Sequence, residues 1–508
     1  MNQLYKGLET MLKNKLEEFL DVLYEFDTKK KLVILKILEQ NNSWTSLSEL
    51  TLASGYSKIT VLKYLTQIEI EAEDEASFSL LTDEQNGCYL KIKDPFDFGQ
   101  YYRGLIFEMW PTQLINDLIK SNSINKIQFI AKHFISESAF KSKIKQIKVI
   151  LSFFSLKLYV HNGIYYLRGN EANIRRLATE FYWEFFKGAA WPFKIVDETL
   201  IIEKVNTIEE KAAIPFSLMD RRKLHYQLAI QELRYKKGFC FSLNSLLSDF
   251  LPVLNELRWD LQSPIKLFPS RDEQYYFYFW LSTESKYFDY FNVSLNDEAF
   301  TLFKQEHLIT VISKSINYMD NEISSLSTEK KEFLTSQLLS TYMNIILFEN
   351  IHSINANELD YNESDTLKSH LAALMTIIDQ EIELTIDTKK FLYYRYRNIL
   401  LSTYTLSIFD KELIVSFCTD LEPLIEKKLL NILNLYFQDI SNVTFISGVR
   451  FAEKNIDLVV HTGLSSEEVL KHNVRHSLYL DTRYLYNPNL SNLLNILSKQ
   501  IDLIRNTH

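Results

Sequence analysis

The chain has 508 residues, enough for three or four domains at about 150 residues each. Hydrophobic residues make up 46% and charged residues 24% of it, which excludes wholesale disorder. The net charge of −9 gives no indication of nucleic-acid binding, so any basic site must be local. With only 11 glycines and 9 prolines, the composition argues against an all-β sandwich and glycine-rich phosphate loops, and favours a mainly α-helical chain.

The cysteines and the N-terminus indicate where the protein resides. Cys88, Cys240 and Cys418 are far apart and odd in number, which excludes a disulfide framework or a cysteine-based zinc site and indicates a reducing compartment. Charged residues run through the N-terminal segment, and no apolar run of about 18 residues occurs. We therefore expect a cytoplasmic protein with no membrane partner.

No catalytic motif is present in the sequence. It has no P-loop, no dinucleotide-binding glycine motif, no nucleophile elbow and no zinc-protease motif. His472 and His476 are four residues apart, but we expect the helix to break between them, and no carboxylate lies at a useful spacing. We expect no enzymatic activity, no metal site and no cofactor.

The first 95 residues begin with three predicted helical segments. Residues 1–24 have apolar side chains at helical spacing and predict an N-terminal arm. The segment KKKLVILKILEQ predicts a helix that ends near Asn42. A short helix, a turn at Gly55 and a longer helix from Ser57 follow.

An acidic stretch at 69–75 is expected to be a solvated linker, with an interaction patch as the alternative. It leads into a predicted β-hairpin, where Asn86-Gly87 suits a type I′ turn. Three helices followed by a hairpin predict a winged helix-turn-helix domain over residues 1–95.

The same order of elements returns in residues 96–194 and predicts a second winged helix-turn-helix domain. The expected elements are helices over 97–109 and 112–121, a short helix, a long helix capped near Ser136, a hairpin around Asn162-Gly163 and a closing helix that ends at Gly188.

The charge pattern of the two recognition helices predicts which one contacts DNA. Between Lys126 and Lys148 there are six lysines and a single acid, Glu137, whereas the first helix leads into acidic residues. A single lysine-rich face is typical of a solvated helix, but two consecutive helix-turn-helix patterns favour double-stranded DNA. The predicted contacts of the second helix, which we rank first, are Ser138, Lys141, Ser142, Lys145 and Lys148. Those of the first are Lys58, Thr60, Lys63 and Tyr64.

The rest of the chain changes character near its end. Residues from about 195 to 415 predict one helix after another. The tail predicts a helix over 421–438 and apolar strands at 442–447, 455–463 and 476–481, with a capped helix from Ser465 and a long C-terminal helix. Alternating helices and strands predict a small parallel α/β domain.

The run NGIYYLRGNEANIRRLATEFYWEFFKGAAWPF at 162–193 resembles the Mga/AtxA family of transcription regulators of Gram-positive bacteria. The features shared with that family are the pattern G-x-E-x-x-I-R after the second hairpin, an aromatic helix and the Trp-Pro-Phe that follows. The resemblance implies two phosphotransferase-system regulatory domains and a C-terminal domain like a sugar-transporter EIIB component. The implied bounds are 1–95 and 96–194 for the winged helices, 195–300 and 301–420 for the regulatory domains, and 421–508 for the EIIB-like domain.

The resemblance also implies histidine phosphorylation by the phosphotransferase carrier protein. The segment KLHYQLAIQELRYKKG matches the first regulatory domain and assigns this role to His225, where the competing interpretation is a half-buried packing histidine. Arg221 and Arg222 would receive the added charge. In the second regulatory domain His370 is the preferred candidate, ahead of His307 and His352.

A working EIIB domain carries phosphate on a cysteine near the end of its first strand. Neither 442–447 nor 455–463 contains a cysteine, and Cys418 is expected in a helix upstream. The resemblance therefore implies a homodimerisation module that has lost phosphotransfer. The leading hypothesis is a DNA-binding transcriptional regulator tuned by phosphorylation, and the alternatives are a phosphocarrier and a scaffold that does not bind DNA.

Overall fold

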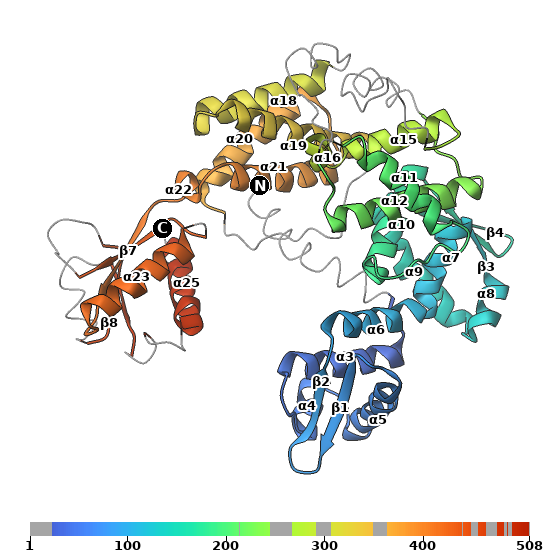
Figure 1. The fold of residues 1–508 in the computed structure, drawn as a ribbon, viewed down its shortest axis with the longest axis horizontal. Helices are drawn as coiled ribbons and strands as arrows, with labels where there is room; N and C mark the ends of the chain where they lie inside the picture. The colour runs from blue at the N-terminus through green and yellow to red at the C-terminus, as the bar shows by residue number, and fades with distance from the viewer. Residues whose placement is uncertain are drawn as a thin grey trace. The chain divides into compact units, whose positions relative to one another are not determined.

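The computed structural model describes residues 23–212, 214–243, 267–290, 306–348, 363–438, 440–448, 456–463, 475–481, 485 and 490–506. The chain divides into two compact units (Figure 1). The first unit comprises Met1–Glu306 and Leu338–Asn357, and the second comprises His307–Gln337 and Glu358–His508. The prediction of a mainly helical, multidomain chain is confirmed. The predicted arm at 1–24 lies outside the described residues except for its last two.

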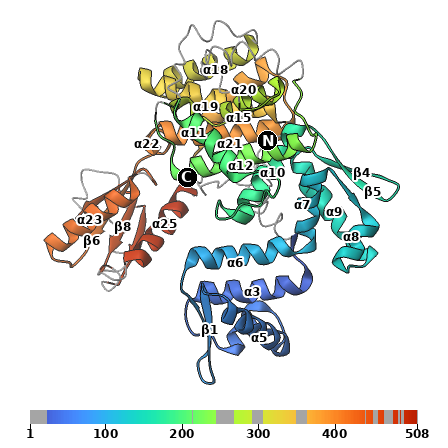
Figure 2. The same ribbon diagram turned by 45° about the vertical axis from the view of Figure 1, so that its right-hand side comes forward.

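The first winged helix-turn-helix is present as predicted (Figure 2). Its elements are α3 (Phe26–Asn41), α4 (Leu47–Ser54), α5 (Lys58–Asp74), β1 (Phe78–Asp83) and β2 (Gly87–Ile92). Ser46 and Glu49 form a capping box at the start of α4, Gly55 ends that helix in the left-handed conformation, and the Ser57 side chain caps α5. Local sequence signals thus determine where these helices begin and end.

Two details of this domain differ from the prediction. The acidic stretch at 69–75 is not a linker, because most of it belongs to the last turns of α5, where Glu71 pairs with Lys31 at 2.7 Å. The wing does not have a type I′ turn, because β1 and β2 are joined by the three residues 84–86 and only Gly87 has a positive φ, 90°. A Cβ atom on Gly87 would lie 2.2 Å from the Thr45 carbonyl oxygen, so the close approach of the neighbouring segment requires glycine here.

The second winged helix-turn-helix begins with two helices that lead into its sheet. Its elements are α6 (Pro95–Glu108), α7 (Trp110–Ser121), β3 (Ser123–Asn125), α8 (Lys126–His133), α9 (Glu137–Phe153), β4 (Lys157–His161), β5 (Ile164–Arg168) and α10 (Glu171–Phe186). The strand order is β3-β5-β4, and all pairs are antiparallel. Asn162 and Gly163 both have positive φ, as a two-residue type I′ hairpin requires. The C-cap of α10 is Lys187 rather than the predicted Gly188, which follows it.

Helices α11 (Glu198–Glu209) and α12 (Leu218–Lys236) follow; α12 packs against α10, and α11 packs against α12 (Figure 1). The first unit also contains α15 (Arg271–Ser282) and α16 (Lys286–Tyr290). Aromatic rings fill the space between α10 and α12: the rings of Trp183 and Phe193 lie 5.7 and 5.3 Å from that of Tyr226. The rings of Phe193 and Tyr226 are buried and belong to the core of the first unit.

The helical part of the second unit precedes a small α/β domain. Its elements are α18 (Glu306–Tyr318), a π-helical turn (Met319–Ile323), the first half of α19 (Thr328–Leu347), α20 (Asp365–Glu381), α21 (Ile386–Thr403) and α22 (Leu406–Phe409). Helices α20 and α21 pack against each other. The Ser315 hydroxyl on α18 lies 3.1 Å from the Tyr396 hydroxyl on α21, so α18 also contacts α21.

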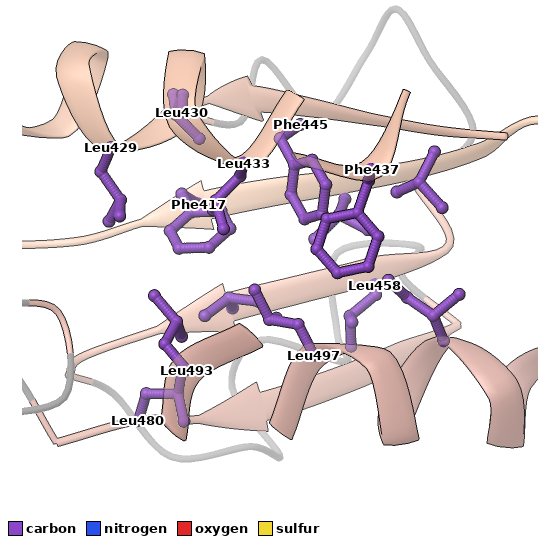
Figure 3. Close-up of a cluster of buried hydrophobic side chains, with 14 of the residues drawn as sticks. Phe417, Leu429, Leu430, Leu433, Phe437, Phe445, Leu458, Leu480, Leu493 and Leu497 are labelled. Atoms are coloured by element: carbon purple, nitrogen blue, oxygen red, sulfur yellow. The ribbon is translucent and has the colours of Figure 1, made fainter. Parts of the chain in front are cut away.

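The C-terminal domain is a four-stranded parallel sheet in the order β7-β6-β8-β9. Its strands are β6 (Leu413–Cys418), β7 (Val443–Ser447), β8 (Leu458–His461) and β9 (His476–Tyr479), and its helices are α23 (Pro423–Phe437) and α25 (Leu490–Asn506). Figure 3 shows side chains of the sheet and of both helices, among them Phe417, Leu433 and Leu497, pointing into one core. The predicted parallel α/β domain is confirmed, whereas the helix predicted from Ser465 lies outside the described residues.

Strand β6 corrects two expectations about this domain. The predicted helical region reached residue 415 and placed Cys418 in a helix, but residues 413–418 form a central strand of the sheet. The sheet thus begins before residue 421, the expected start of the domain. The run LIVSFC is apolar almost throughout, so its periodicity does not distinguish a buried strand from a buried helix.

Candidate DNA-binding surface

Helix α9 divides cleanly into a buried face and an exposed face. The Ser136 hydroxyl accepts a hydrogen bond from the Ala139 N–H at 3.1 Å and begins the helix. The buried face consists of Phe140, Ile144, Ile147, Ile150 and Leu151. The predicted contact residues Ser138, Lys141, Ser142, Lys145 and Lys148 are all exposed on the other side. The structure therefore places the whole predicted set on one accessible surface.

The charge on this face is partly compensated at its N-terminal end. The Glu137 carboxylate lies 2.7 Å from the Lys141 amine and 3.1 Å from that of Lys126. Hydrogen bonds from both lysines lower the pKa of the Glu137 carboxyl. Lys145 and Lys148 form no ion pair with any other part of the described chain, so their charges remain available to a ligand.

The two helix-turn-helix units have the same local construction. Helices α4 and α8 each have eight residues, α5 and α9 each have 17, and a residue with positive φ ends the first helix of each pair. In both units a serine N-cap stands two residues after that positive-φ residue: Ser57 follows Gly55, and Ser136 follows Phe134. Each residue of α5 therefore has an equivalent in α9, at the same number of positions after the serine N-cap.

At these equivalent positions, the two recognition helices expose different kinds of side chain. Four exposed positions of α9 hold Ser138, Lys141, Lys145 and Lys148. The same positions of α5 hold Ile59, Leu62, Thr66 and Glu69, which are also exposed. Because phosphate contacts depend on cations, the second helix is much the better match to DNA.

The predicted residues of the first helix are not all exposed. Lys58 and Lys63 are exposed and Thr60 is half-buried, but Tyr64 is buried, so its assignment to the outward face is wrong. The buried positions of α5 are Val61, Tyr64, Leu65 and Ile68, an i, i+3, i+4, i+7 pattern that leaves Leu62 in solvent. Tyr64 is therefore a core residue, and the Lys63 amine lies 5.0 Å from its ring centroid.

The wing carries two exposed cations that are not among the predicted contacts. Lys157 on β4 pairs with Arg168 on β5 in the strand register, and both are exposed. Tyr159 and Val160 on β4 are also exposed. The sequence signal that could have identified them is a basic residue at the first and at the last position of the hairpin.

Comparisons with known proteins agree with this geometry. Residues 96–182 match the Mga helix-turn-helix domain, a range that contains α9 and both strands of the second wing. The chain is related to the Mga/AtxA family. Two similar proteins of Bacillus anthracis are the capsule synthesis positive regulators AcpA, 24% identical over 216 residues, and AcpB, 21% identical over 223 residues. These matches cover 42% and 43% of this chain and 44% and 45% of the relatives, so each spans less than half of either protein.

The Mga-type motif G-x-E-x-x-I-R has a structural role here. Gly169 has φ 153°, and a Cβ atom there would lie 2.4 Å from the Leu156 side chain. Glu171 accepts hydrogen bonds from Arg175 Nε at 3.0 Å and from Arg234 Nε at 2.9 Å. Arg234 on α12 also donates to the Ile119 carbonyl at the end of α7. The motif thus ties the Mga domain to the helices that follow it.

His225 is not exposed as its proposed modification would require. Its side chain on α12 is 6% exposed, and neither ring nitrogen has a hydrogen-bond partner within the described structure. Burial, followed by the charges of Arg222 and Arg221, lowers the pKa of His225 to about 4. The imidazole is therefore neutral and enclosed at neutral pH.

The two arginines beside His225 already have partners. Arg221 pairs with Glu209, and Arg222 pairs with Glu198 and donates to the Gly188 carbonyl at 2.7 Å. A phosphate on His225 would have to displace these carboxylates to gain their cations.

His370 on α20 is more accessible than His225. Its Nδ1 lies 3.0 Å from the Tyr318 hydroxyl, its ring is half-buried, and burial lowers its pKa. His307 is exposed and lies 3.7 Å from Glu381, whereas His352 is outside the described residues. Of the candidates, His370 combines partial exposure with a fixed ring.

Cys418 ends β6, at the carboxyl edge of the parallel sheet. It pairs in register with His461, whose side chain is buried and whose Nε2 has no hydrogen-bond partner in the part of the chain that is described. The argument that the domain lacks a cysteine at the end of its first strand is therefore wrong. Among the described residues, no three His, Cys, Asp or Glu side chains cluster as metal ligands, and no helix is long and apolar enough to cross a membrane.

Proposed function

We propose that this protein is a DNA-binding transcriptional regulator that contacts double-stranded DNA mainly through α9 of its Mga-type domain. The observation that carries the proposal is the exposed face of Lys141, Lys145 and Lys148, in a protein of net charge −9. Recognition helices of this fold class enter the major groove while flanking cations neutralise phosphates. The names of AcpA and AcpB, positive regulators of capsule synthesis, agree with a role in gene regulation.

Salt-controlled DNA binding tests this proposal. Replacing Lys141, Lys145 and Lys148 with alanine should lower affinity and reduce the log–log salt slope by up to about 0.9 per lost phosphate contact. The matched control, Lys58→Ala with Lys63→Ala, removes two exposed cations from α5 and should have a smaller effect. Equal losses in the two variants would contradict the assignment to α9.

The regulator acts as a homodimer held together by its C-terminal domain. Helix α23 exposes Leu424 at 74% and Leu435 at 68%, and these residues lie three turns apart on one face. Ile425 and Tyr436 extend this apolar surface. Two-fold pairing is the commonest assembly of identical chains, and it would hold the DNA-binding domains of the two protomers at a fixed spacing.

Phosphorylation by the phosphotransferase carrier protein modulates the regulator, with His370 as the accessible acceptor. The Tyr318 hydroxyl occupies Nδ1, which leaves Nε2 for the phosphoryl group. His225 becomes an acceptor only when α12 exposes its ring and Arg221 and Arg222 leave Glu209 and Glu198. Incubation with the phosphorylated carrier should label His225→Ala like the wild type and should label His370→Ala much less.

A phosphocarrier is the second candidate function, and one observation favours it. Cys418 stands at the carboxyl end of the first strand of a parallel sheet, where such sheets place their ligands. In the same labelling experiment, a Cys418→Ser variant separates the candidates. Loss of label with Cys418→Ser, and onward transfer from the wild type to another protein, would favour the phosphocarrier.

A further inference from the structure

Phe134 is an exposed aromatic residue in the turn that leads into α9. It is the C-cap residue of α8 and precedes the Ser136 N-cap of α9 by two positions. Its side chain is 96% exposed, the largest exposed fraction among the large hydrophobic residues of the described chain. A single exposed apolar residue is ordinary, but this one stands in the turn before the helix that carries the exposed lysines.

The backbone of Phe134 is also unfavourable for its side chain. Its φ is 52° and its ψ is 39°, a left-handed conformation that glycine and asparagine adopt readily and that is an outlier for a bulky residue. The first helix-turn-helix has Gly55 at the corresponding position, with φ 71°. The same turn is therefore built with glycine elsewhere in this chain, and neither packing nor backbone geometry explains a phenylalanine at 134.

We infer that Phe134 is a sequence-reading residue that contacts thymine methyl groups in the major groove. The inference rests on the proposed DNA-binding function of α9. A helix-turn-helix inserts the N-terminal end of its second helix into the major groove, and Phe134 stands two residues before the N-cap of that helix. The thymine 5-methyl is the apolar group that base edges offer there, and phenylalanine is one of the side chains that contact it.

Duplexes with and without that methyl group test the inference. The probes are an alternating dA-dT duplex and the matching dA-dU duplex, which lacks the 5-methyl, titrated at one salt concentration with the full-length protein. The wild type should prefer dA-dT by about four-fold, the value of one buried methyl group. The preference should vanish in Phe134→Gly and persist in Phe134→Trp. Dividing the dA-dT preference of the wild type by that of Phe134→Gly cancels any effect of a difference in shape between the duplexes.

Stability and a control variant separate this role from a structural one. Glycine adopts the left-handed conformation without strain, so Phe134→Gly should unfold at the same temperature as the wild type or a higher one. Leu200→Ala, which removes a 47% exposed apolar side chain from α11, should keep the wild-type preference.

Three results would overturn the inference. An unchanged preference in Phe134→Gly would mean that Phe134 does not touch the methyl group, as expected if it docks a protein. An equal loss on both duplexes would place it on the sugar–phosphate backbone. A wild type that binds the dA-dT and dA-dU duplexes equally well would show that the thymine methyl group is not recognised. A wild type that binds neither duplex would instead reject the proposed function.

Discussion

Arg175 and Glu273 form a bidentate ion pair in which neither side chain is exposed, although they lie 98 residues apart in the sequence. The two guanidinium nitrogens are 2.7 and 2.8 Å from the two carboxylate oxygens. Arg175 belongs to the Mga-type helix-turn-helix domain and Glu273 to α15, so the pair joins that domain to the helices that follow. The Phe241 N–H also donates to Glu273 at 2.7 Å, which leaves the carboxylate well satisfied.

Removing the negative charge from this pair should strongly destabilise the first unit. In Glu273→Gln the buried Arg175 loses its bidentate carboxylate and keeps only Glu171, which it shares with Arg234, so the cost should be about 3–5 kcal/mol. The matched control is Glu137→Gln, which breaks two exposed pairs and should cost much less. Urea unfolding measures both, and similar losses in the two variants would show that the buried pair is not essential.

Acidification should destabilise the fold through His225. Its pKa is about 4 in the folded protein but about 6.5 in an unfolded chain, so protonation favours unfolding between these values. The stability is present above pH 6.5 and is lost as the pH falls toward 4, by about 2 kcal/mol at pH 5.

Replacing His225 with leucine should remove this contribution. Both ring nitrogens lack partners in the described structure, so His225→Leu should cost little at pH 7.5 and should raise stability relative to the wild type at pH 5. Thermal unfolding across pH measures the difference. His307→Leu changes an exposed histidine and should leave the profile unchanged, and a parallel shift of the His225→Leu profile would contradict the assignment.

The apolar face of α23 should determine the oligomeric state. Leu424→Asp combined with Leu435→Asp places two charges on the proposed interface without touching the core residue Leu433. We expect a dimeric wild type and a monomeric variant by light scattering at the same concentration. Lys427→Gln with Lys428→Gln lowers the net charge by the same two units at exposed positions between them and controls for charge alone. A variant that stays dimeric would move the interface away from Leu424 and Leu435.

Much of the architecture followed from local sequence. Serine caps, the turn at Gly55 and the Asn162-Gly163 hairpin involve neighbours a few residues apart, and the lysine face of α9 repeats at helical spacing. Short-range propensity and periodicity were therefore sufficient for both winged helices. They were also sufficient for three of the four strands of the C-terminal sheet.

Other features depended on contacts between distant segments. The side of α5 that is buried, and with it Tyr64, is decided by the elements that pack on it. An apolar run such as β6 becomes a central strand only because β7 and β8 pair with it on either side. The enclosure of His225 and the pairing of Arg175 with Glu273 likewise arise only once the chain is folded. Sequence alone determined the local elements and the charge they display, whereas burial and pairing were decided by tertiary structure, because both depend on residues far away along the chain.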